Sequence, residues 1–342
     1  MHKISVVITG QVKSSVIFFE SLKEFIALKE EGIVNEIVLS TWKGEIEKLN
    51  ESITKQLNEH VVIITPNPPK VNSGTAFYQM KSLHCALNKL SDKKTFVFKT
   101  RPDLYISKED IKEIIKLDNN VRSKKSPFVN KVWVPWFEVS KPFYMADECF
   151  YCNYPDAIKL YNYDTIYDNY FDIDAGISHI RRFYHPFTSI YPEFEHFFLK
   201  FGVTGHGTSQ RFRLFDVLYE NVNYKKGLRQ YYKILEHSFN IGLHKYGYIT
   251  FREWNKSEKK TIFNSLEDAV KPINSFEPSK GHVYGYNNND VKTLLGDDAI
   301  YNEVIPSEDD DITKVKIFNI MNSMPKVSLM KRILFKVLSY VK

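Results

Sequence analysis

The chain has 342 residues, of which 43% are hydrophobic and 26% charged, a composition typical of a soluble globular protein with one large or two ordinary domains. Its net charge of +6 favours anionic ligands or an anionic membrane surface, and since no long Lys/Arg run is present, we expect no nucleic-acid partner. The three cysteines, with one C-x-x-C at Cys149 and Cys152, are too few for a disulfide framework. We therefore expect buried thiols and, without an apolar signal segment, a cytoplasmic protein.

The first third of the chain alternates between strand-like and helix-like segments. Strands are predicted at residues 4–9, 36–41 and 61–65 and from residue 95, and helices after Ser14 and at 45–59 and 76–90. Strands that alternate with helices form parallel units with right-handed crossovers, so this order predicts an α/β fold with a mostly parallel sheet flanked by helices. Neither G-x-G-x-x-G nor G-x-x-x-x-G-K-[ST] occurs, so dinucleotide and P-loop sites are not supported.

Charged residues follow the fourth predicted strand, in the stretch TFVFKTRPDLYI at 95–106. Pro102 cannot donate to a strand ladder, so the strand should end near it and leave Lys99, Arg101 and Asp103 at its carboxyl end. Ligands bind at this edge of open α/β sheets. Two cations suit an anionic ligand, and the carboxylate suits a metal ion or a hydroxyl. The alternative is a strand end held by structural ion pairs.

Beyond residue 130 the pattern is less regular and richer in helices. Strands are predicted at 131–135 and 148–154, and helices at 110–117, 157–170, 177–183, 193–201, 208–219 and 227–240. The segments 242–251 and 281–289 show no clear period, and 307–312 reads as an acidic linker.

The last segment, 326–342, has an amphipathic pattern without acidic residues. On a helical wheel its apolar side chains gather on one side and Lys331, Arg332, Lys336 and Lys342 on the other. This pattern is typical of an interfacial helix attracted to anionic lipid, although the segment is too short to span a bilayer. The alternative is a terminal helix that docks on the protein's own core.

Several blocks of the sequence resemble the WavE lipopolysaccharide synthesis family. In the first third they are Gly10-Gln11, the S-T-W-K-G of 40–44, Pro66, Asn72, Gln79, Ser82 and the K-T-R-P-D of 99–103. Further on, Asp147 with Phe150 and Asp156 is similar to an aspartate–aromatic block, and Pro192-Glu193 to a Pro-Glu motif. S-T-W-K-G and K-x-R-x-D together are the most specific of these.

The resemblance implies a glycosyltransferase of surface-polysaccharide assembly with a GT-A-like, Rossmann-type sheet and a helix-rich C-terminal part. It divides the chain into a nucleotide-sugar (donor) half at 1–141, an acceptor half of the same globule at 142–306, and a linker with the basic helix at 307–342. It also places the trio Lys99, Arg101 and Asp103 where related folds carry an Asp-x-Asp metal motif. A Mn²⁺ or Mg²⁺ cofactor would then bind Asp103, yet the cation Arg101 stands in place of one carboxylate.

The donor site predicted on this basis contains ten residues. They are Thr9, Gly10, Gln11, Thr41, Trp42, Asn72, Gln79, Lys99, Arg101 and Asp103. Arg101 would hold phosphate oxygens bidentately and Lys99 would act as a point charge, while Asp103 would bind a metal or a sugar hydroxyl. Gly10 permits close backbone approach. Trp42 would either stack on the base or pack in the core, and the amides of Asn72 and Gln79 would bind the donor or serve as caps.

Transfer with inversion needs a carboxylate to take the acceptor's proton. Asp147, which precedes a strand-like run, is the first candidate for this base, with a plain turn aspartate as the alternative. Glu193 is the second candidate, although at a helix start it can simply favour the helix dipole. His206, between two glycines, is a further candidate for a phosphate or metal contact.

The function expected is transfer of a sugar from a nucleotide-sugar donor to a lipopolysaccharide, lipooligosaccharide or capsule acceptor. The partners are then the donor, a glycan or glycolipid acceptor and the anionic inner-membrane surface, reached from the cytoplasm through the C-terminal helix. A sugar nucleotidyltransferase on a similar sheet is one alternative, but it usually needs a Gly-rich, basic loop after the first strand. A non-catalytic carbohydrate-binding protein is the other, which the 15% aromatic content permits.

Overall fold

The structure, a computed structural model, describes about three fifths of the chain. The described residues are 3–13, 15–68, 74–121, 125–139, 141–161, 182–194, 197, 222–242, 249–250, 278–279, 282–285 and 287–296. Asn72, His206 and the helix predicted at 326–342 lie outside these ranges, as do the helices predicted at 208–219 and most of 157–170, 177–183 and 193–201.

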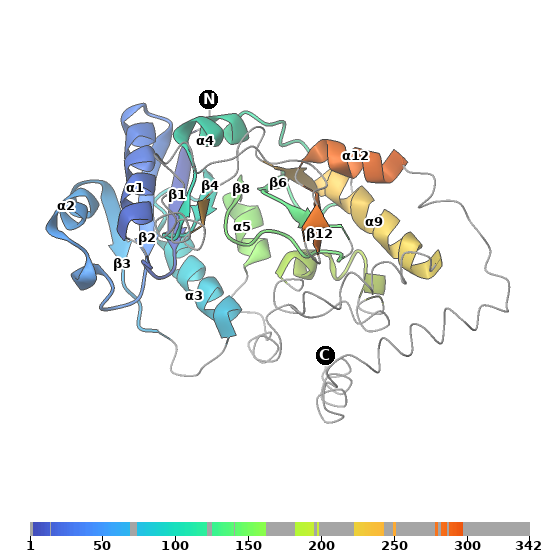
Figure 1. Cartoon of the computed structure of the whole chain (residues 1–342), viewed down its shortest axis with the longest axis horizontal. Helices are drawn as coiled ribbons and strands as arrows, with labels where there is room; N and C mark the ends of the chain where they lie inside the picture. The colour runs from blue at the N-terminus through green and yellow to red at the C-terminus, as the bar shows by residue number, and fades with distance from the viewer. Residues whose placement is uncertain are drawn as a thin grey trace, which may run out of the picture.

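A seven-stranded sheet forms the centre of the fold (Figure 1). Its order is β3 (Val61–Ile64), β2 (Val34–Ser40), β1 (Ile4–Thr9), β4 (Phe96–Thr100), β8 (Phe150–Asn153), β6 (Val132–Val134) and β9 (Phe239–Ile241). β1 pairs in parallel with β2 and β4, β2 with β3, and β6 with β9, while β8 runs antiparallel to β4 and β6. The predicted α/β class with a mostly parallel sheet is confirmed, and β8 and β9 from beyond residue 141 complete it.

Helices cover both faces of this sheet and create two cores (Figure 1). On one face pack α1 (Ser15–Glu30), α2 (Glu51–His60) and α4 (Lys108–Ile115), and on the other α3 (Gly74–Lys89), α5 (Tyr154–Leu160) and α9 (Val222–Ser238). Alternation along β1 explains the division, because Val6 and Ile8 point into the first core and Val7 into the second. Each such fully buried side chain contributes about 1.5–3 kcal/mol.

The helix predicted at 45–59 is divided in the structure. A 3-10 turn, Ile46–Lys48, comes first, and α2 then begins at Glu51. Asn50 sets this boundary, because it has an extended backbone and its Oδ1 accepts a hydrogen bond from the Ile53 amide at 2.9 Å. Ser107 caps α4 in the same way through the Asp110 amide at 3.1 Å.

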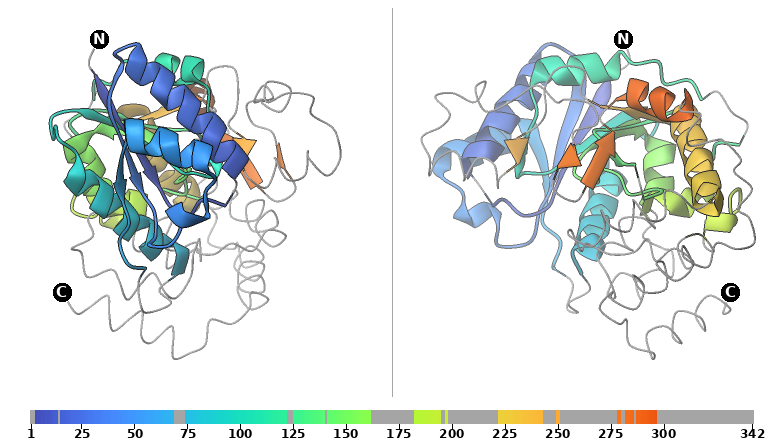
Figure 2. Two further views of the ribbon diagram at one scale, coloured as in Figure 1. Left: turned by 90° about the vertical axis from the view of Figure 1, so that its left-hand side faces the viewer. Right: turned by 45° about the vertical axis from the view of Figure 1, so that its right-hand side comes forward.

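The prediction of one continuous helix at 227–240 is wrong at its C-terminal end. α9 stops at Ser238, and Phe239–Ile241 turn into β9, in which Asn240 lies opposite Trp133 of β6. Burial of β9 in the sheet overrides the helical pattern. The segment 281–289 also contains regular structure, namely β12 (His282–Gly285) and the start of α12 (Asn288–Gly296), and α12 lies beside α9 (Figure 2).

Two small sheets complete the described elements. One pairs β5 (Leu104–Tyr105) with β10 (Ile249–Thr250), and the other joins β11 (Pro278–Ser279), β12 and β7 (Phe137–Glu138). No described helix combines the length and the apolar character needed to cross a membrane.

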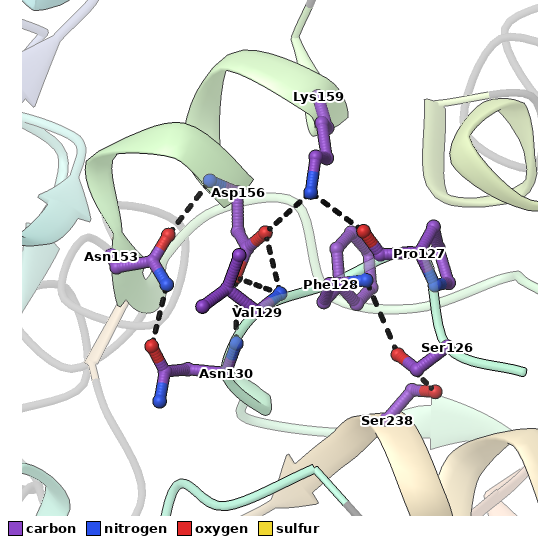
Figure 3. Close-up of polar contacts among 9 residues, drawn as sticks. All are labelled: Ser126, Pro127, Phe128, Val129, Asn130, Asn153, Asp156, Lys159 and Ser238. Carbon is purple, nitrogen blue, oxygen red and sulfur yellow. Dashed lines mark hydrogen bonds and ion pairs between the residues drawn. The ribbon is translucent and has the colours of Figure 1, made fainter. Parts of the chain in front are cut away.

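Asp156, part of the aspartate–aromatic block, is a structural residue (Figure 3). The Oδ2 of its buried carboxylate accepts hydrogen bonds from the backbone amides of Val129 and Asn130, both at 2.9 Å. Its Oδ1 forms an ion pair with Nζ of Lys159 at 3.1 Å. Asn153 caps α5 through the Asp156 amide at 2.8 Å and also donates to the Asn130 side chain at 2.6 Å. These contacts fix the 127–130 segment on α5.

Candidate functional site

The loops after β1 and β4 meet at the carboxyl edge of the sheet. Gly10 has a φ of +121°, which side-chain-bearing residues rarely adopt, and its amide donates to the Ser40 carbonyl at 3.0 Å. A Cβ at this glycine would lie 3.7 Å from Cδ of Pro102. The loop after β1 therefore lies against the Arg-Pro-Asp turn, and the predicted place of Gly10 in the donor site stays a prediction.

Arg101 and Asp103 form a bidentate ion pair at this edge. Arg101 Nε donates to Asp103 Oδ1 at 2.7 Å and Nη2 to Oδ2 at 2.5 Å, and Lys13 Nζ lies 3.4 Å from the same Oδ2. The Asp103 side chain is 8% exposed and that of Arg101 25%. Asp103 thus holds the guanidinium in place, and a quarter of the Arg101 side chain still faces solvent.

The charges of this pair stabilise each other. Burial alone would raise the pKa of Asp103, but the Arg101 guanidinium, with help from Lys13, lowers it below its usual value. Burial likewise opposes the charge on Arg101, and the Asp103 carboxylate holds the pKa of Arg101 above its ordinary value. Both groups are charged at neutral pH.

Lys99 is fully buried and has a different environment from the other two members of the trio. Its Nζ donates to the main-chain carbonyls of Asp147 at 2.6 Å and Glu148 at 2.9 Å. Burial lowers the pKa of Lys99 to about 8, against the opposing charge of Asp147. In this geometry Lys99 fixes the segment that enters β8, and its predicted contact with phosphate stays a prediction.

The carboxylate of Asp147 pairs with a buried arginine. Oδ2 of Asp147 lies 2.6 Å from Nη1 of Arg182, and both side chains are almost completely inaccessible. The same Nη1 donates to Gln79 Oε1 of α3 at 3.0 Å, and the Tyr161 ring lies 5.2 Å from the guanidinium carbon. Asp147 and Gln79, both predicted site residues, are therefore joined by a third residue that the sequence did not single out.

Glu148 is the carboxylate next to this pair. The residue is half-buried, and its Oε2 is closed off from solvent with no hydrogen-bond partner. Burial and, next to it, the charge of Asp147 raise the pKa of Glu148 to about 7, against the opposing effects of Arg101 and Lys99. A carboxyl group that titrates near neutral pH is suited to proton transfer.

Three threonine hydroxyls near the ends of neighbouring strands have no partner. Thr9 ends β1, Thr41 follows β2 and Thr100 ends β4, and the Oγ1 of each is buried without a hydrogen bond. Buried hydroxyls normally have partners, so this edge carries unused polar capacity. Thr9 and Thr41 were predicted at the donor site, and Thr100 was not.

Trp42 and Gln11 lie at the same edge. Trp42 is 8% exposed and packs edge-on against Tyr78 of α3 with ring centroids 5.5 Å apart, which is the core-packing alternative in this structure. Gln11 Nε2 donates to Oε1 of Glu45 at 3.3 Å. Their predicted contacts with a nucleotide stay predictions.

Glu193 stands apart from these groups in its described contacts. It is exposed, and its Oε1 accepts a hydrogen bond of 2.5 Å from Gln230 of α9. Asn72 and His206 belong to the parts of the chain that the structure does not describe.

The described residues around Asp103 do not fit a divalent cation. A metal ion needs several oxygen ligands, whereas cationic side chains already occupy both oxygens of this carboxylate. Among the described residues, no three His, Cys, Asp or Glu side chains lie close enough together to hold a metal. The metal contact predicted for Asp103 is left without further support, and we derive no chemical step from it.

Sequence reasoning missed Glu148 and Arg182. A signal for Glu148 was present, because Asp147 and Glu148 form an acidic pair directly before an aromatic strand. Arg182 has no comparable signal, since 35 positions separate it from its partner Asp147.

Comparison with known proteins gives little further information. No protein-family model matches the chain, and no curated protein sequence matches it. Among solved structures, a UTP-bound UGPase from Acinetobacter baumannii is similar at a TM-score of 0.27 and 9% sequence identity, over 58% of this chain and 99% of that chain. A likeness this low carries no argument about function.

Proposed function

We propose that this chain is a glycosyltransferase that moves a sugar from a nucleotide-sugar donor. The observation that carries the proposal is the Arg101–Asp103 pair at the carboxyl end of β4, where the loops after β1 and β4 meet. Parallel strands end at this edge, which is where open α/β sheets bind ligands. A cationic fork fixed in orientation and partly exposed there suits a diphosphate.

The chemistry of sugar transfer matches the groups at this edge. The diphosphate leaving group has to be neutralised, and Arg101 presents a planar guanidinium that matches phosphate oxygens. Lys13, half-exposed at 49%, adds a second cation on the same side of Asp103. In this proposal Asp103 is a positioning residue that sets the angle of Arg101.

The acceptor class comes from the resemblance to the WavE family. Its S-T-W-K-G and K-x-R-x-D blocks correspond to residues near the carboxyl ends of β2 and β4, so the two most specific matches lie at one edge of the sheet. We propose membership of this family, with a lipopolysaccharide, lipooligosaccharide or capsule acceptor. The C-terminal helix would keep the enzyme near that lipid-linked acceptor.

A sugar nucleotidyltransferase is the second candidate. Lys13 supports it, because this cation belongs to the loop after β1 and reaches the turn after β4. A basic loop in this position is what a nucleotidyltransferase uses to hold a triphosphate. The two functions share the donor edge and differ in the bond that breaks.

A panel of nucleotide sugars tests the proposal. The protein is incubated with UDP-, GDP-, CMP- and dTDP-sugars, with and without Mn²⁺, and free nucleotide is measured. We expect slow release of nucleotide from one donor, and at least a tenfold loss of this release in Arg101→Met. Absence of release from every donor, with the protein folded and stable, would contradict the proposed function.

A further inference from the structure

In the acidic pair Asp147–Glu148, an arginine holds the first carboxylate, while the second has an oxygen, Oε2, without a hydrogen-bond partner among the described residues. Asp147 Oδ2 is held by the Arg182 guanidinium at 2.6 Å, with both side chains buried. An arginine-paired carboxylate stays ionised and is a poor proton acceptor. The sequence favours Asp147 as the base, whereas its pairing suits a group that fixes its surroundings.

Glu148 is better suited than Asp147 to accept a proton from the incoming hydroxyl. Its Oε2 is closed off from solvent and has no hydrogen-bond partner in the structure, while the residue as a whole is half-buried. Its backbone is held firmly, because the buried Lys99 ammonium donates to the main-chain carbonyls of Asp147 and of Glu148 itself. An unused carboxylate oxygen therefore sits on a fixed main chain.

Glu148 also lies beside the predicted phosphate-binding group. β4 and β8 pair antiparallel with Lys99 opposite Phe150. Arg101 directly follows β4 and Glu148 lies two residues before β8, so both residues lie at the same end of this strand pair. The charges of the two side chains also influence each other. A donor whose diphosphate contacts Arg101 would thus carry its sugar near Glu148.

We propose that Glu148 is the proton acceptor of the transfer reaction, an assignment that rests on the proposed glycosyltransferase function. Its carboxylate takes the proton of the incoming hydroxyl while the hydroxyl oxygen bonds to the anomeric carbon. The bond from that carbon to the diphosphate oxygen breaks, and its electron pair leaves with the nucleotide. The products are the glycoside, the nucleotide and a proton on Glu148, with inversion at the anomeric carbon.

The protonation behaviour of Glu148 agrees with this role. Burial and the neighbouring Asp147 raise its pKa to about 7, close to the value at which a base is both ionised and able to hold a proton. The charged and titratable groups that act on Glu148 are Asp147, Lys99, Arg101 and Cys149.

The test uses the full-length protein, the donor found in the nucleotide-sugar panel, and water as the acceptor. Glu148→Gln and Glu148→Ala are compared with wild type for binding of the matching free nucleotide, for nucleotide release, and for release in the presence of sodium azide. Azide is an anionic nucleophile that needs no deprotonation. The matched control is Glu36→Gln, a half-buried glutamate near the start of β2 that bonds Ser5 and the Ser91 amide.

We expect both Glu148 variants to bind the nucleotide within about threefold of wild type and to release it roughly 100-fold more slowly. Azide should restore release in Glu148→Ala with formation of the inverted glycosyl azide, and Glu36→Gln should behave like wild type. Release within tenfold of wild type in either Glu148 variant would overturn the assignment, as would lost nucleotide binding or a lack of response to azide. If wild type itself releases no nucleotide, the proposed function fails and the assignment fails with it.

Discussion

Asp147 and Arg182 form a buried ion pair in which Oδ2 and Nη1 are 2.6 Å apart. The pair joins the entry of β8 to a residue 35 positions later in the chain. Gln79 of α3 shares the same guanidinium nitrogen at 3.0 Å. Arg182 therefore connects α3 with the segment that enters β8. These contacts fix the position of the segment that carries Glu148.

Removing the arginine should destabilise the fold strongly. Arg182→Met leaves the Asp147 carboxylate buried without its counter-ion, and we expect a loss of about 3–5 kcal/mol in the free energy of unfolding. The double variant Asp147→Asn with Arg182→Met should recover part of that loss, because no buried charge remains unpaired. Urea denaturation measures both, and an Arg182→Met midpoint equal to wild type would show that the pair is not important for stability.

Asp156 should be important for stability and not for turnover. In Figure 3 its carboxylate holds the amides of Val129 and Asn130 and the ammonium of Lys159. Asp156→Ala leaves these donors without their acceptor, at a cost of about 2–4 kcal/mol. Nucleotide release per folded molecule should stay close to wild type, measured below the unfolding transition. A large loss of release in a fully folded sample would place Asp156 in the reaction after all.

Nucleotide binding should depend on the bidentate geometry of the Arg101 guanidinium and not only on its charge. Arg101→Lys keeps the cation but loses bidentate geometry, so we expect about 10-fold weaker binding of the matching nucleoside diphosphate by calorimetry. Asp103→Asn removes the charge that orients Arg101 and should weaken binding by a similar factor. Equal affinities in wild type, Arg101→Lys and Asp103→Asn would remove this pair from the phosphate site.

The raised pKa of Glu148 predicts a pH-dependent stability difference. The folded state holds this proton up to about pH 7, whereas the ordinary value is 4.5. Its contribution to stability is therefore fully present below about pH 4 and is lost as the pH rises through 7. Glu148→Gln, which stays neutral, should be more stable than wild type at pH 8 by an amount on the order of 1–2 kcal/mol, with little difference at pH 4. Urea midpoints at both pH values measure this, and a constant difference would contradict it.

The basic C-terminal segment predicts membrane attraction. Deletion of residues 326–342 should reduce sedimentation with vesicles that contain anionic lipid, because this amphipathic segment carries five cations and no acidic residue. Neutral vesicles serve as the control and should bind both forms weakly. Unchanged sedimentation of the shortened chain would end this proposal.

Local pattern was enough to predict most of the helices and strands in the first third of the chain. β1 was predicted at its observed bounds, and α3 and β3 within about two residues, because apolar alternation and spacing decide these elements. β9 was missed because a three-residue strand carries too little pattern, and its pairing with β6 is decided by tertiary contacts.

Part of the candidate site was also predictable from the sequence, and part was not. Arg101 and Asp103 were predictable as an edge cluster, because a buried strand followed by charge and proline marks the carboxyl end of a sheet strand. The distribution of roles was not predictable. The Lys99 ammonium is bound by a main-chain carbonyl 48 positions later in the chain, and Arg182 pairs with Asp147 across 35 positions. Only the folded chain therefore shows that, within the part that the structure describes, Glu148 and not Asp147 is the carboxylate without an arginine partner.

The central claim is transfer of a sugar from a nucleotide sugar, and ³¹P NMR of the reaction products tests it most directly. With the donor selected from the panel, we expect wild type to produce the free nucleoside diphosphate, or the monophosphate from a CMP-sugar, and this signal to fall at least tenfold in Arg101→Met. Formation of nucleoside triphosphate and sugar 1-phosphate when pyrophosphate is added would contradict the account, because it would show a nucleotidyltransferase at the same edge of the sheet.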